Sequence, residues 1–394
     1  MRRLPFEYAV RNLGRSPSRL LMSVAGSALV VLLVIAAGGF VSGMQTAFRS
    51  SGSPNNVILI GSGSEESVER SEIPMRTTAI AAASLPDIIR KAGAEAISPE
   101  IHLALPIRFT KNASENNEES SNRLALVRGV LPAAYMVHQN VRITSGRMPE
   151  SGINEIAVGA LAARALGFEP SDSILGRELI FDDIPFTAVG MIEADGGVIE
   201  GEIWMPLTDL QVVAQRDSLS CVVMSLKSTD IGSVEAFAAR RIDLEIIAEH
   251  EQKYYAALAA FYGPIRAMVL VTALLVAAGG ILGGLNTTYA AFASRVREIG
   301  TLQTLGYSRR AIVRSLIEES ILSASIGSLI AIAIGMLLLD GVVVRFSMGV
   351  FGLQIGPEVL AAGLTAGLFL GIIGAAVPAI RCLSLPIPQA LRSA

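Results

Sequence analysis

The sequence predicts a membrane protein with four transmembrane α-helices and a large α+β extracytoplasmic domain inserted between helices 1 and 2. Composition is the first indication: 51% of the 394 residues are hydrophobic and only 17% are charged, whereas soluble domains carry about 25% charged residues. The apolar residues are gathered in blocks, and arginines flank those blocks unevenly. The net charge of −3 gives no indication of nucleic-acid binding.

Four apolar segments are long enough to span a membrane. A transmembrane helix needs about 17–25 apolar residues to cross roughly 30 Å of hydrocarbon, and the segments 20–42, 263–290, 316–340 and 358–380 meet this requirement. The first follows several arginines, as in a secretory signal peptide. Its apolar run is longer than the usual signal-peptide core of about 7–15 residues, and no small-residue cleavage site follows cleanly, so we expect an uncleaved anchor.

Arginine in the short loops predicts the orientation, because cytoplasmic loops carry an excess of Arg and Lys. The amphipathic N-terminal segment 1–19, the loop 291–315 and the tail 381–394 are expected in the cytoplasm. Segment 43–262 and the short loop 341–357 are expected outside. The arginines that decide this are Arg2, Arg3, Arg11, Arg15, Arg19, Arg295, Arg297, Arg309, Arg310, Arg314, Arg381 and Arg392.

Segment 43–262 alternates short apolar runs with helical patterns, which predicts an α+β module. Strands are expected at "NVILI", "RLALVRGV", "EIWMPL" and "CVVMSLK", and two more joined at Asp182–Asp183. A helix is expected from about Pro86 with a break at Gly93, and a polar loop at "TKNASENNEESSNR". From about Val234 a helical stalk is expected to run into the second span, interrupted or kinked near Gly263–Pro264.

No pattern in the chain predicts catalysis, a metal site or a bound cofactor. The three histidines, His102, His138 and His250, make no pair at metal-ligand spacing, so isolated surface or core positions are the expectation. A phosphate-binding P-loop needs Gly before its Lys. The residues that precede the four lysines are Arg90, Thr110, Leu226 and Gln252. Any nucleotide hydrolysis is therefore expected from a partner.

The second span carries glycines four residues apart, in the pairs Gly279–Gly283 and Gly280–Gly284. Such spacing lets helix backbones approach closely in a membrane. Packing within one chain and a dimer seam are both compatible with this pattern. The spans contain few ionisable residues, so no polar transport path is predicted.

The cytoplasmic loop contains the amphipathic stretch "REIGTLQTLGYSRR", which begins at Arg297. Ile299, Leu302 and Leu305 fall at helical spacing and predict a helix with one apolar face. Taken alone, this helix could rest on the inner membrane surface with its arginines on lipid phosphates, or dock on a partner protein.

Several stretches together resemble the FtsX-like, MacB-type permeases of the ABC transporter superfamily. They are "YAVRNLGRSPSRLLMSVAG", "SGRMPESGINEIAVGALAARALG", "SRVREIGTLQTLGYSRRAIVRSLIEESILSASIG" and "VPAIRCLSLPIPQALR", in this order and over nearly the whole chain. The resemblance implies a multi-pass protein of the bacterial plasma (inner) membrane, with a MacB-like outer domain.

The resemblance also implies partners and a mechanism. A separate ABC ATPase would hold ATP and Mg, and a second permease copy, identical or paralogous, would complete the complex. ATP-driven motion would pass to the outer domain by mechanotransmission. The resemblance also allows a periplasmic adaptor or a lipoprotein as an additional partner. The alternatives are a signalling permease that regulates an outside hydrolase, and a membrane-anchored sensor. The implied coupling helix, which docks on the ATPase, contains Arg297, Glu298, Ile299, Leu302, Leu305 and Gly306.

Overall fold

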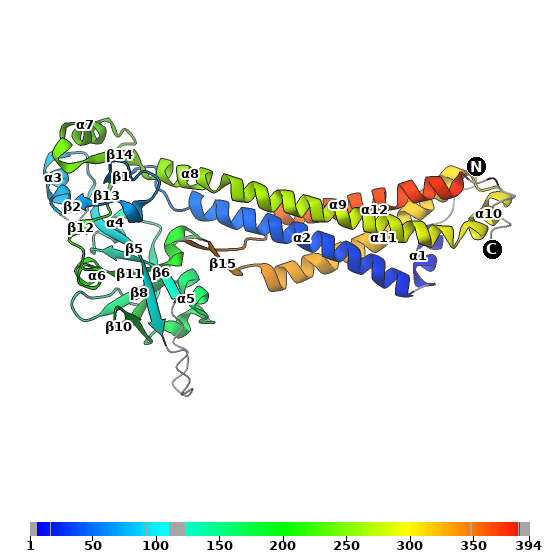
Figure 1. Ribbon diagram of the computed structural model, residues 1–394, viewed down its shortest axis with the longest axis horizontal. Helices are drawn as coiled ribbons and strands as arrows, with labels where there is room; N and C mark the ends of the chain where they lie inside the picture. The colour runs from blue at the N-terminus through cyan, green and yellow to red at the C-terminus, as the bar shows by residue number, and fades with distance from the viewer. Residues whose placement is uncertain are drawn as a thin grey trace. The chain divides into compact units, whose positions relative to one another are not determined.

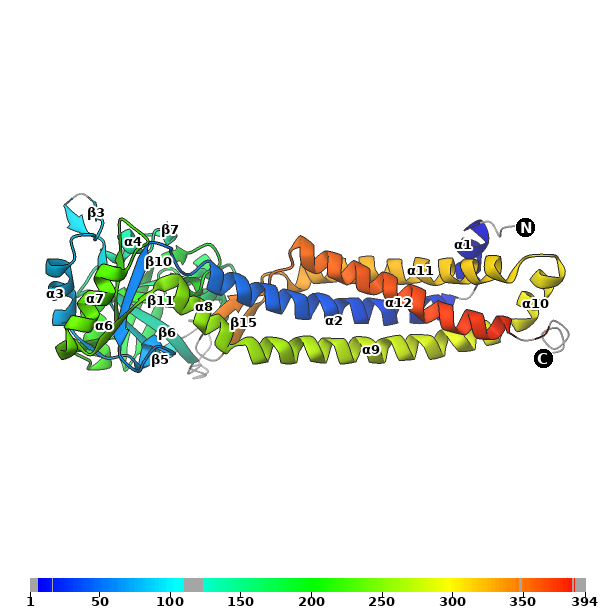
Figure 2. The ribbon, with the colours of Figure 1, turned by 90° about the horizontal axis from the view of Figure 1, so that it is seen from above.

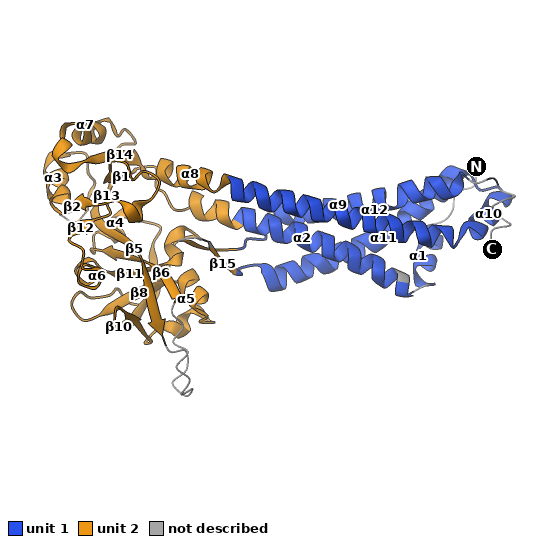
Figure 3. Ribbon diagram, in the orientation of Figure 1, with its two compact units in different colours: residues 1–42, 264–342, 353–394 blue, residues 43–263, 343–352 orange. Residues whose placement is uncertain are grey.

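The computed structural model divides into two compact units, coloured separately in Figure 3. Unit 1 comprises residues 1–42, 264–342 and 353–394, and unit 2 comprises residues 43–263 and 343–352. The residues that the structure describes are 6–15, 17–91, 93–109, 123–346, 349–384 and 386. The predicted polar loop at 110–122 lies outside them.

Unit 1 is built from helices (Figure 1). In chain order they are α1 (Phe6–Gly14), α2 (Pro17–Arg49), α9 (Gly263–Ala293), α10 (Val296–Thr304), α11 (Arg309–Ile334), which continues as a π-helix to Leu339, and α12 (Pro357–Leu383). Four helices in the described chain are long and apolar enough to cross a membrane: Leu20–Arg49, Gly263–Ala293, Arg309–Leu339 and Pro357–Leu383. This confirms the prediction of four candidate spans.

Small residues bring three of these helices together. A Cβ atom added to Gly327 on α11 would lie 2.0 Å from Ser27 Oγ on α2, and one added to Gly367 on α12 would lie 2.0 Å from Ser328 Oγ on α11. Only glycine allows so close an approach. Small residues at helix contacts are typical of membranes, where the hydrophobic effect does not drive helices together. Figure 2 shows α9 running alongside α2, but the most apolar part of α9 has no buried residue within the chain.

Unit 2 contains a large mixed sheet. Within the described residues, ten strands are connected, in the order β14–β1–β13–β5–β6–β11–β8–β10–β7, with β9 pairing to both β10 and β5. Most pairs are antiparallel, while β11–β6 and β10–β8 are parallel. The strands are β1 (Asn56–Gly61), β5 (Ile97–Phe109), β6 (Arg123–Val130), β7 (Arg142–Gly146), β8 (Glu155–Gly159), β9 (Glu178–Phe181), β10 (Ile184–Glu193), β11 (Glu202–Pro206), β13 (Cys221–Ser225) and β14 (Ile246–His250).

Helices cover the sheet and complete its core. The helices of unit 2 are α3 (Arg76–Ser84), α4 (Ala134–Val137), α5 (Ala160–Leu166), α6 (Leu207–Ala214), α7 (Gly232–Arg240) and α8 (Glu251–Phe261). Strands β1, β8, β11 and β13 are buried along their whole length. The apolar side chains on one face of these strands pack with α5, α6 and α7 in one large cluster. Short two-stranded ladders join β2 (Ile73–Pro74) to β12 (Ser218–Leu219) and β15 (Val343–Phe346) to β16 (Gly349–Gly352).

The turn at Asp182–Asp183 is confirmed. Both residues have positive φ, 45° and 65°, as the two central residues of a type I′ hairpin require, and Asp tolerates this conformation better than most residues. The turn joins β9 to β10, which pair antiparallel from Phe181 and Ile184 outward.

Two helix predictions in this unit are wrong. No helix begins at Pro86: a short hairpin forms instead from β3 (Arg90–Lys91) and β4 (Ala94–Glu95). The backbone N–H of Ile89 donates to Ser225 O at the end of β13. The β-branched residues Ile88 and Ile89 therefore adopt an extended conformation beside the sheet.

The helix expected from Val234 is also interrupted, because β14 pairs antiparallel with β1. Ile246 and Ile247 favour a strand once an edge is available. The predicted break near Gly263–Pro264 is confirmed, since α8 ends at Phe261 and α9 begins at Gly263.

Candidate functional site

The stretch between the second and third candidate spans forms helix α10, as its periodicity predicts. Gly306 follows the helix with φ of +89°, a conformation that favours glycine and ends the helix. Ser308 then caps α11, its hydroxyl accepting from the N–H of Ala311 at 3.3 Å. The predicted site residues Arg297, Glu298, Ile299 and Leu302 lie on α10, and Leu305 is its C-cap.

One face of α10 packs against the chain itself. Ile299 is only 2% exposed and lies in an apolar cluster with residues of α11 and α12, against which Leu302 also packs. The side chain of Ile299, predicted to lie in the docking contact, fills the intramolecular core and exposes little surface in this chain. The buried members of this cluster are Phe292, Val296, Ile299, Ile312, Leu316, Ala375, Ala379, Cys382 and Leu383.

Glu298 also makes contacts within the chain. Its carboxylate accepts hydrogen bonds from the Tyr8 hydroxyl at 2.6 Å and from Nε of Arg295 at 3.1 Å. Arg295 in turn contacts Glu319 on α11 at 3.1 Å. Burial alone would raise the pKa of Glu298, but these hydrogen bonds hold it below its ordinary value. The result is a polar network that joins α1, α10 and α11.

The opposite face of α10 is exposed. Arg297, Thr301, Thr304 and Leu305 follow one another at spacings of a helical face and are all exposed. Leu305 is 62% exposed and is the one large apolar side chain among these four residues. We call these four residues the outer face of α10.

The four glycines of α9 divide between two environments. A Cβ atom on Gly280 would lie 2.3 Å from Cγ2 of Val30 on α2, so this glycine is needed for packing inside the chain. Nothing lies within 4 Å of the corresponding position on Gly279, Gly283 or Gly284. The Gly279–Gly283 pair is exposed and therefore open to another molecule.

A second polar site is buried in unit 2, where neighbouring strands place ionisable residues on one face of the sheet. Glu100 and His102 are two apart on β5 and so point the same way. Cys221 on β13 pairs directly with Glu100, and Arg128 on β6 pairs directly with His102. Glu202 joins them from β11, the next strand of the sheet.

Arg128 and Glu100 are the centres of this cluster. Arg128 donates two hydrogen bonds of 2.7 Å to Glu202 and one of 2.9 Å to Glu100. His138, which follows α4, contacts Oε1 of Glu100 at 2.7 Å, and His102 contacts Oε2 at 3.0 Å. Glu100 is fully buried and Arg128 is only 2% exposed.

The close contacts govern the ionisation of the cluster. Burial alone would raise the pKa of Glu100, but the charges of His138 and Arg128 hold it well below its usual range. Burial alone would lower the pKa of His138, yet the charge and hydrogen bond of Glu100 raise it. Burial raises the pKa of the Cys221 thiol, so the thiol stays protonated at neutral pH.

Two of the three histidines are core residues, one of the two environments expected for them, but they are not isolated from each other. His102 and His138 are 36 positions apart in the sequence, yet both contact Glu100. Sequence spacing could not predict this, because the sheet register and the turn after α4 bring them together. His250 ends β14, apart from this contact.

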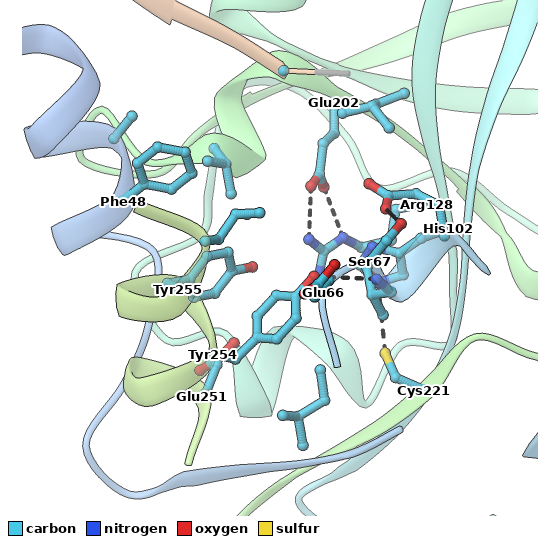
Figure 4. Close-up of a pocket in the computed structure, with 18 of the residues that line it drawn as sticks. Phe48, Glu66, Ser67, His102, Arg128, Glu202, Cys221, Glu251, Tyr254 and Tyr255 are labelled. Carbon is cyan, nitrogen blue, oxygen red and sulfur yellow. Dashed lines mark hydrogen bonds and ion pairs between the residues drawn. The ribbon is translucent and has the colours of Figure 1, made fainter. Parts of the chain in front are cut away.

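The cluster borders a cavity of about 280 Å³. Figure 4 shows the aromatic side chains Phe48, Tyr254 and Tyr255 opposite the charged groups. Phe48 belongs to the last turn of α2, and the two tyrosines to α8. Aromatic side chains from these two helices therefore face charged side chains from the sheet, and α8 also contributes the buried carboxylate of Glu251.

Two family models account for most of the chain. The MacB-like periplasmic core domain matches residues 20–240, and the FtsX-like permease C-terminal domain matches residues 270–387. The chain belongs to the FtsX-like, MacB-type family of ABC transporter permeases. This confirms the resemblance noted in the sequence, and the permease has the MacB-like outer domain of that family.

Among curated relatives, the permease is 23% identical over 258 residues to the pyoverdine export ATP-binding/permease protein PvdT of Pseudomonas entomophila. It is 24% identical over 280 residues to the uncharacterized ABC transporter permease YknZ of Bacillus subtilis, and 26% identical over 406 residues to the macrolide export ATP-binding/permease protein MacB of Hyphomonas neptunium. The three alignments cover 60%, 66% and 95% of this chain. They cover 38%, 68% and 58% of the relatives.

Solved structures of outer domains also match the permease. The periplasmic region of MacB from Actinobacillus actinomycetemcomitans matches at 12% identity with a TM-score of 0.39, covering 55% of this chain and 97% of that one. The extracellular domain of YknZ from Gram-positive bacteria matches at 12% identity with a TM-score of 0.37, covering 50% and 98%.

Proposed function

We propose that this permease is the membrane subunit of an ABC-type export complex, in which it transmits the motion of a separate ATPase to unit 2. Membership of the permease family supports the role in the membrane. Two relatives are named for the export of pyoverdine and of macrolides, and both names include an ATP-binding part. In the proposed complex a separate subunit supplies ATP binding, with Mg, and this chain is not itself catalytic.

The observation that carries the proposal is the anchoring of α10. Its inner face is fixed to α11 and α12 by the apolar cluster around Ile299, and Glu298 ties it to α1. The outer face remains free in this chain and ends in the exposed Leu305. An amphipathic helix held this firmly can pass a displacement on to the helices behind it.

Helix α2 provides a route for that displacement. It is continuous from Pro17 to Arg49, and it packs closely against α11 at Ser27. Its last turns belong to unit 2, where Phe48 stacks on Tyr262 with ring centroids 5.7 Å apart. A movement along the helix axis would therefore reach the cavity that Phe48 lines.

We further propose that the complex contains a second permease copy, identical or paralogous. The exposed pair Gly279–Gly283 on α9 supports this, since small residues four apart suit close helix contact. Handling of the substrate on the outer side, with or without a periplasmic adaptor or lipoprotein, fits the near absence of charged residues in the spans.

The docking proposal is tested with Leu305→Asp. The permease is co-expressed with a candidate partner ABC ATPase from the same organism, and the two proteins are purified together in detergent. A carboxylate in a buried contact costs several kcal/mol, comparable to the affinity of a modest interface, so the variant should lose the ATPase. Val10→Asp on α1, which replaces another exposed apolar residue, is the matched control and should retain it.

Retention of the ATPase by Leu305→Asp would contradict docking through the outer face. Export and signalling are separated by the proteins recovered with the wild-type permease. Recovery of a cell-envelope hydrolase, together with unchanged export in cells that lack the permease, would favour the signalling alternative.

A further inference from the structure

We propose that Glu100, His102 and Cys221 form a binding site for a divalent cation with an affinity for sulfur and nitrogen ligands, of which Zn²⁺ fits best. Each of the three residues offers one ligand atom, and these atoms lie within 4.8 Å of one another. Carboxylate oxygen, imidazole nitrogen and thiolate sulfur are the ligands that Zn²⁺ takes in proteins. All three residues are buried.

The sheet holds the three ligands in place. Glu100 and His102 share one face of β5, and Cys221 lies directly opposite Glu100 on β13. Ser220 fixes the two strands at this point: its hydroxyl accepts from the N–H of His102 at 3.0 Å, and its own N–H donates to Glu100 O at 2.8 Å. Ligands on paired strands hold their positions better than ligands on loops.

The ligand separations suit a tetrahedral ion. Nε2 of His102 lies 3.7 Å from Sγ of Cys221 and 3.0 Å from Oε2 of Glu100. Bond lengths of about 2.3 Å for Zn–S and about 2.0–2.2 Å for Zn–N and Zn–O, at tetrahedral angles, require separations of about 3.5 Å and about 3.3 Å. A shift of a few tenths of an ångström brings Nε2 of His102 to these distances from the other two ligand atoms, which lie within 4.8 Å of each other.

The groups around the ligands favour a cation. Three buried carboxylates, those of Glu100, Glu202 and Glu251, line the cavity with a single buried guanidinium, that of Arg128. These groups carry three negative charges and one positive charge, and a protonated His138, whose pKa Glu100 raises, still leaves one more negative than positive charge. Nη1 of Arg128 donates to the same Oε2 of Glu100 at 2.9 Å, so a bound cation would take this oxygen from Arg128, which would keep its two hydrogen bonds to Glu202. His138 contacts the other oxygen of Glu100 and so orients it, as partners of ligating carboxylates do.

Binding would follow ordinary thiolate chemistry. The thiol of Cys221 loses its proton to solvent as its sulfur joins the metal, and His102 binds as the neutral imidazole. With three protein ligands, a fourth position remains for water from the adjoining cavity. The cavity is also lined by Glu66, Glu69 and Arg70, so these three residues add one net negative charge near the route of the incoming cation.

Cobalt is the probe for the test, since Co²⁺ takes tetrahedral zinc sites and reports thiolate ligation by absorption. The full-length permease, without a histidine tag, is reduced, stripped with a chelator in detergent and titrated with Co²⁺. We expect one Co²⁺ per chain and a thiolate-to-cobalt charge-transfer band, which Zn²⁺ should abolish. Zn²⁺ should also raise the temperature of unfolding.

The two cysteines provide a matched pair of variants. Cys221→Ser should lose the band and Cys382→Ser should keep it, because Cys382 lies on α12 in unit 1. Glu69→Gln, a change in another lining residue, should keep the stoichiometry of one.

Because the wild-type titration needs no variant to fold, it can overturn the proposal alone. Absence of stoichiometric Co²⁺ binding, or binding without the thiolate band, would do so. A band that depends on Cys382 would also overturn it. None of these outcomes bears on the docking of α10, so the site and the transport proposal stand or fall separately.

Discussion

The hydroxyl of Tyr8 donates a hydrogen bond of 2.6 Å to Oε1 of Glu298, joining the first helix of the chain to the loop helix α10. Arg295 and Arg15 contact the same carboxylate. On α11, Glu319 accepts from Asn12 of α1 at 2.7 Å. The N-terminal amphipathic segment is therefore part of the support of α10, a role that its sequence pattern did not predict.

Removing the Tyr8 hydroxyl should loosen α10. Tyr8→Phe deletes one hydrogen bond to a charged group, which contributes about 1 kcal/mol when partly exposed. Amide hydrogen exchange in residues 296–304 should speed up by roughly fivefold. Tyr289→Phe, on an exposed position of α9, should leave it unchanged. Equal exchange in both variants would mean that the Tyr8 contact does not support α10.

The two faces of α10 should respond differently to alanine. Ile299→Ala removes a buried side chain and should lower the free energy of unfolding by about 2–5 kcal/mol. Leu305→Ala removes an exposed one and should change it by less than about 0.5 kcal/mol. Thermal unfolding of the purified permease measures both. A larger effect for Leu305 than for Ile299 would reverse the assignment of the faces.

The glycines of α9 should separate packing from self-association. Gly280→Leu would collide with Val30, so the variant should be less stable as a single chain. Gly279→Leu meets nothing within 4 Å and should fold normally. If Gly279 lies in a dimer seam, its leucine variant should dissociate to monomers in detergent, as measured by light scattering. An intact dimer would place the seam elsewhere.

The buried pair in unit 2 should matter far more than an exposed one. Arg128→Met leaves Glu202 and Glu100 without their cation and should destabilise the domain by about 3–5 kcal/mol. Arg142→Met breaks a pair with Asp195 in which the two side chains are 69% and 57% exposed, and little change is expected. The measurement is urea unfolding followed by fluorescence of Trp204, which lies 5.7 Å from the Arg128 guanidinium. Similar midpoints for the two variants would contradict the assigned importance of Arg128.

The orientation of the chain can be tested by thiol labelling. Cys221 is fully buried and Cys382 is 6% exposed, so the native cysteines should stay unreactive in the folded protein. Val212→Cys on α6 adds a thiol at a position that is 70% exposed in unit 2. A membrane-impermeant reagent applied outside the inner membrane should label it. Thr301→Cys on α10 should react only after permeabilisation, and the reverse pattern would invert the predicted topology.

The sequence by itself determined the features that depend on local pattern. Long apolar runs and their arginines predict spans because the bilayer fixes their length, and the Asp182–Asp183 turn is readable because few residues adopt its φ angles. The apolar period predicted helix α10. It could not predict which side faces the chain, because Ile299 and Leu305 both belong to that period and only packing distinguishes them.

Tertiary structure alone decided the rest. The stretches after Pro86 and Val234 have helical patterns. Parts of both are extended in the structure because their backbones hydrogen-bond to neighbouring strands, β13 and β1. Gly280 and Gly279 are adjacent and identical, and only the position of Val30 separates them. His102, His138 and Cys221 lie far apart in the chain and gather around Glu100 because strand register brings them there. Such long-range placement leaves no period or spacing in the sequence.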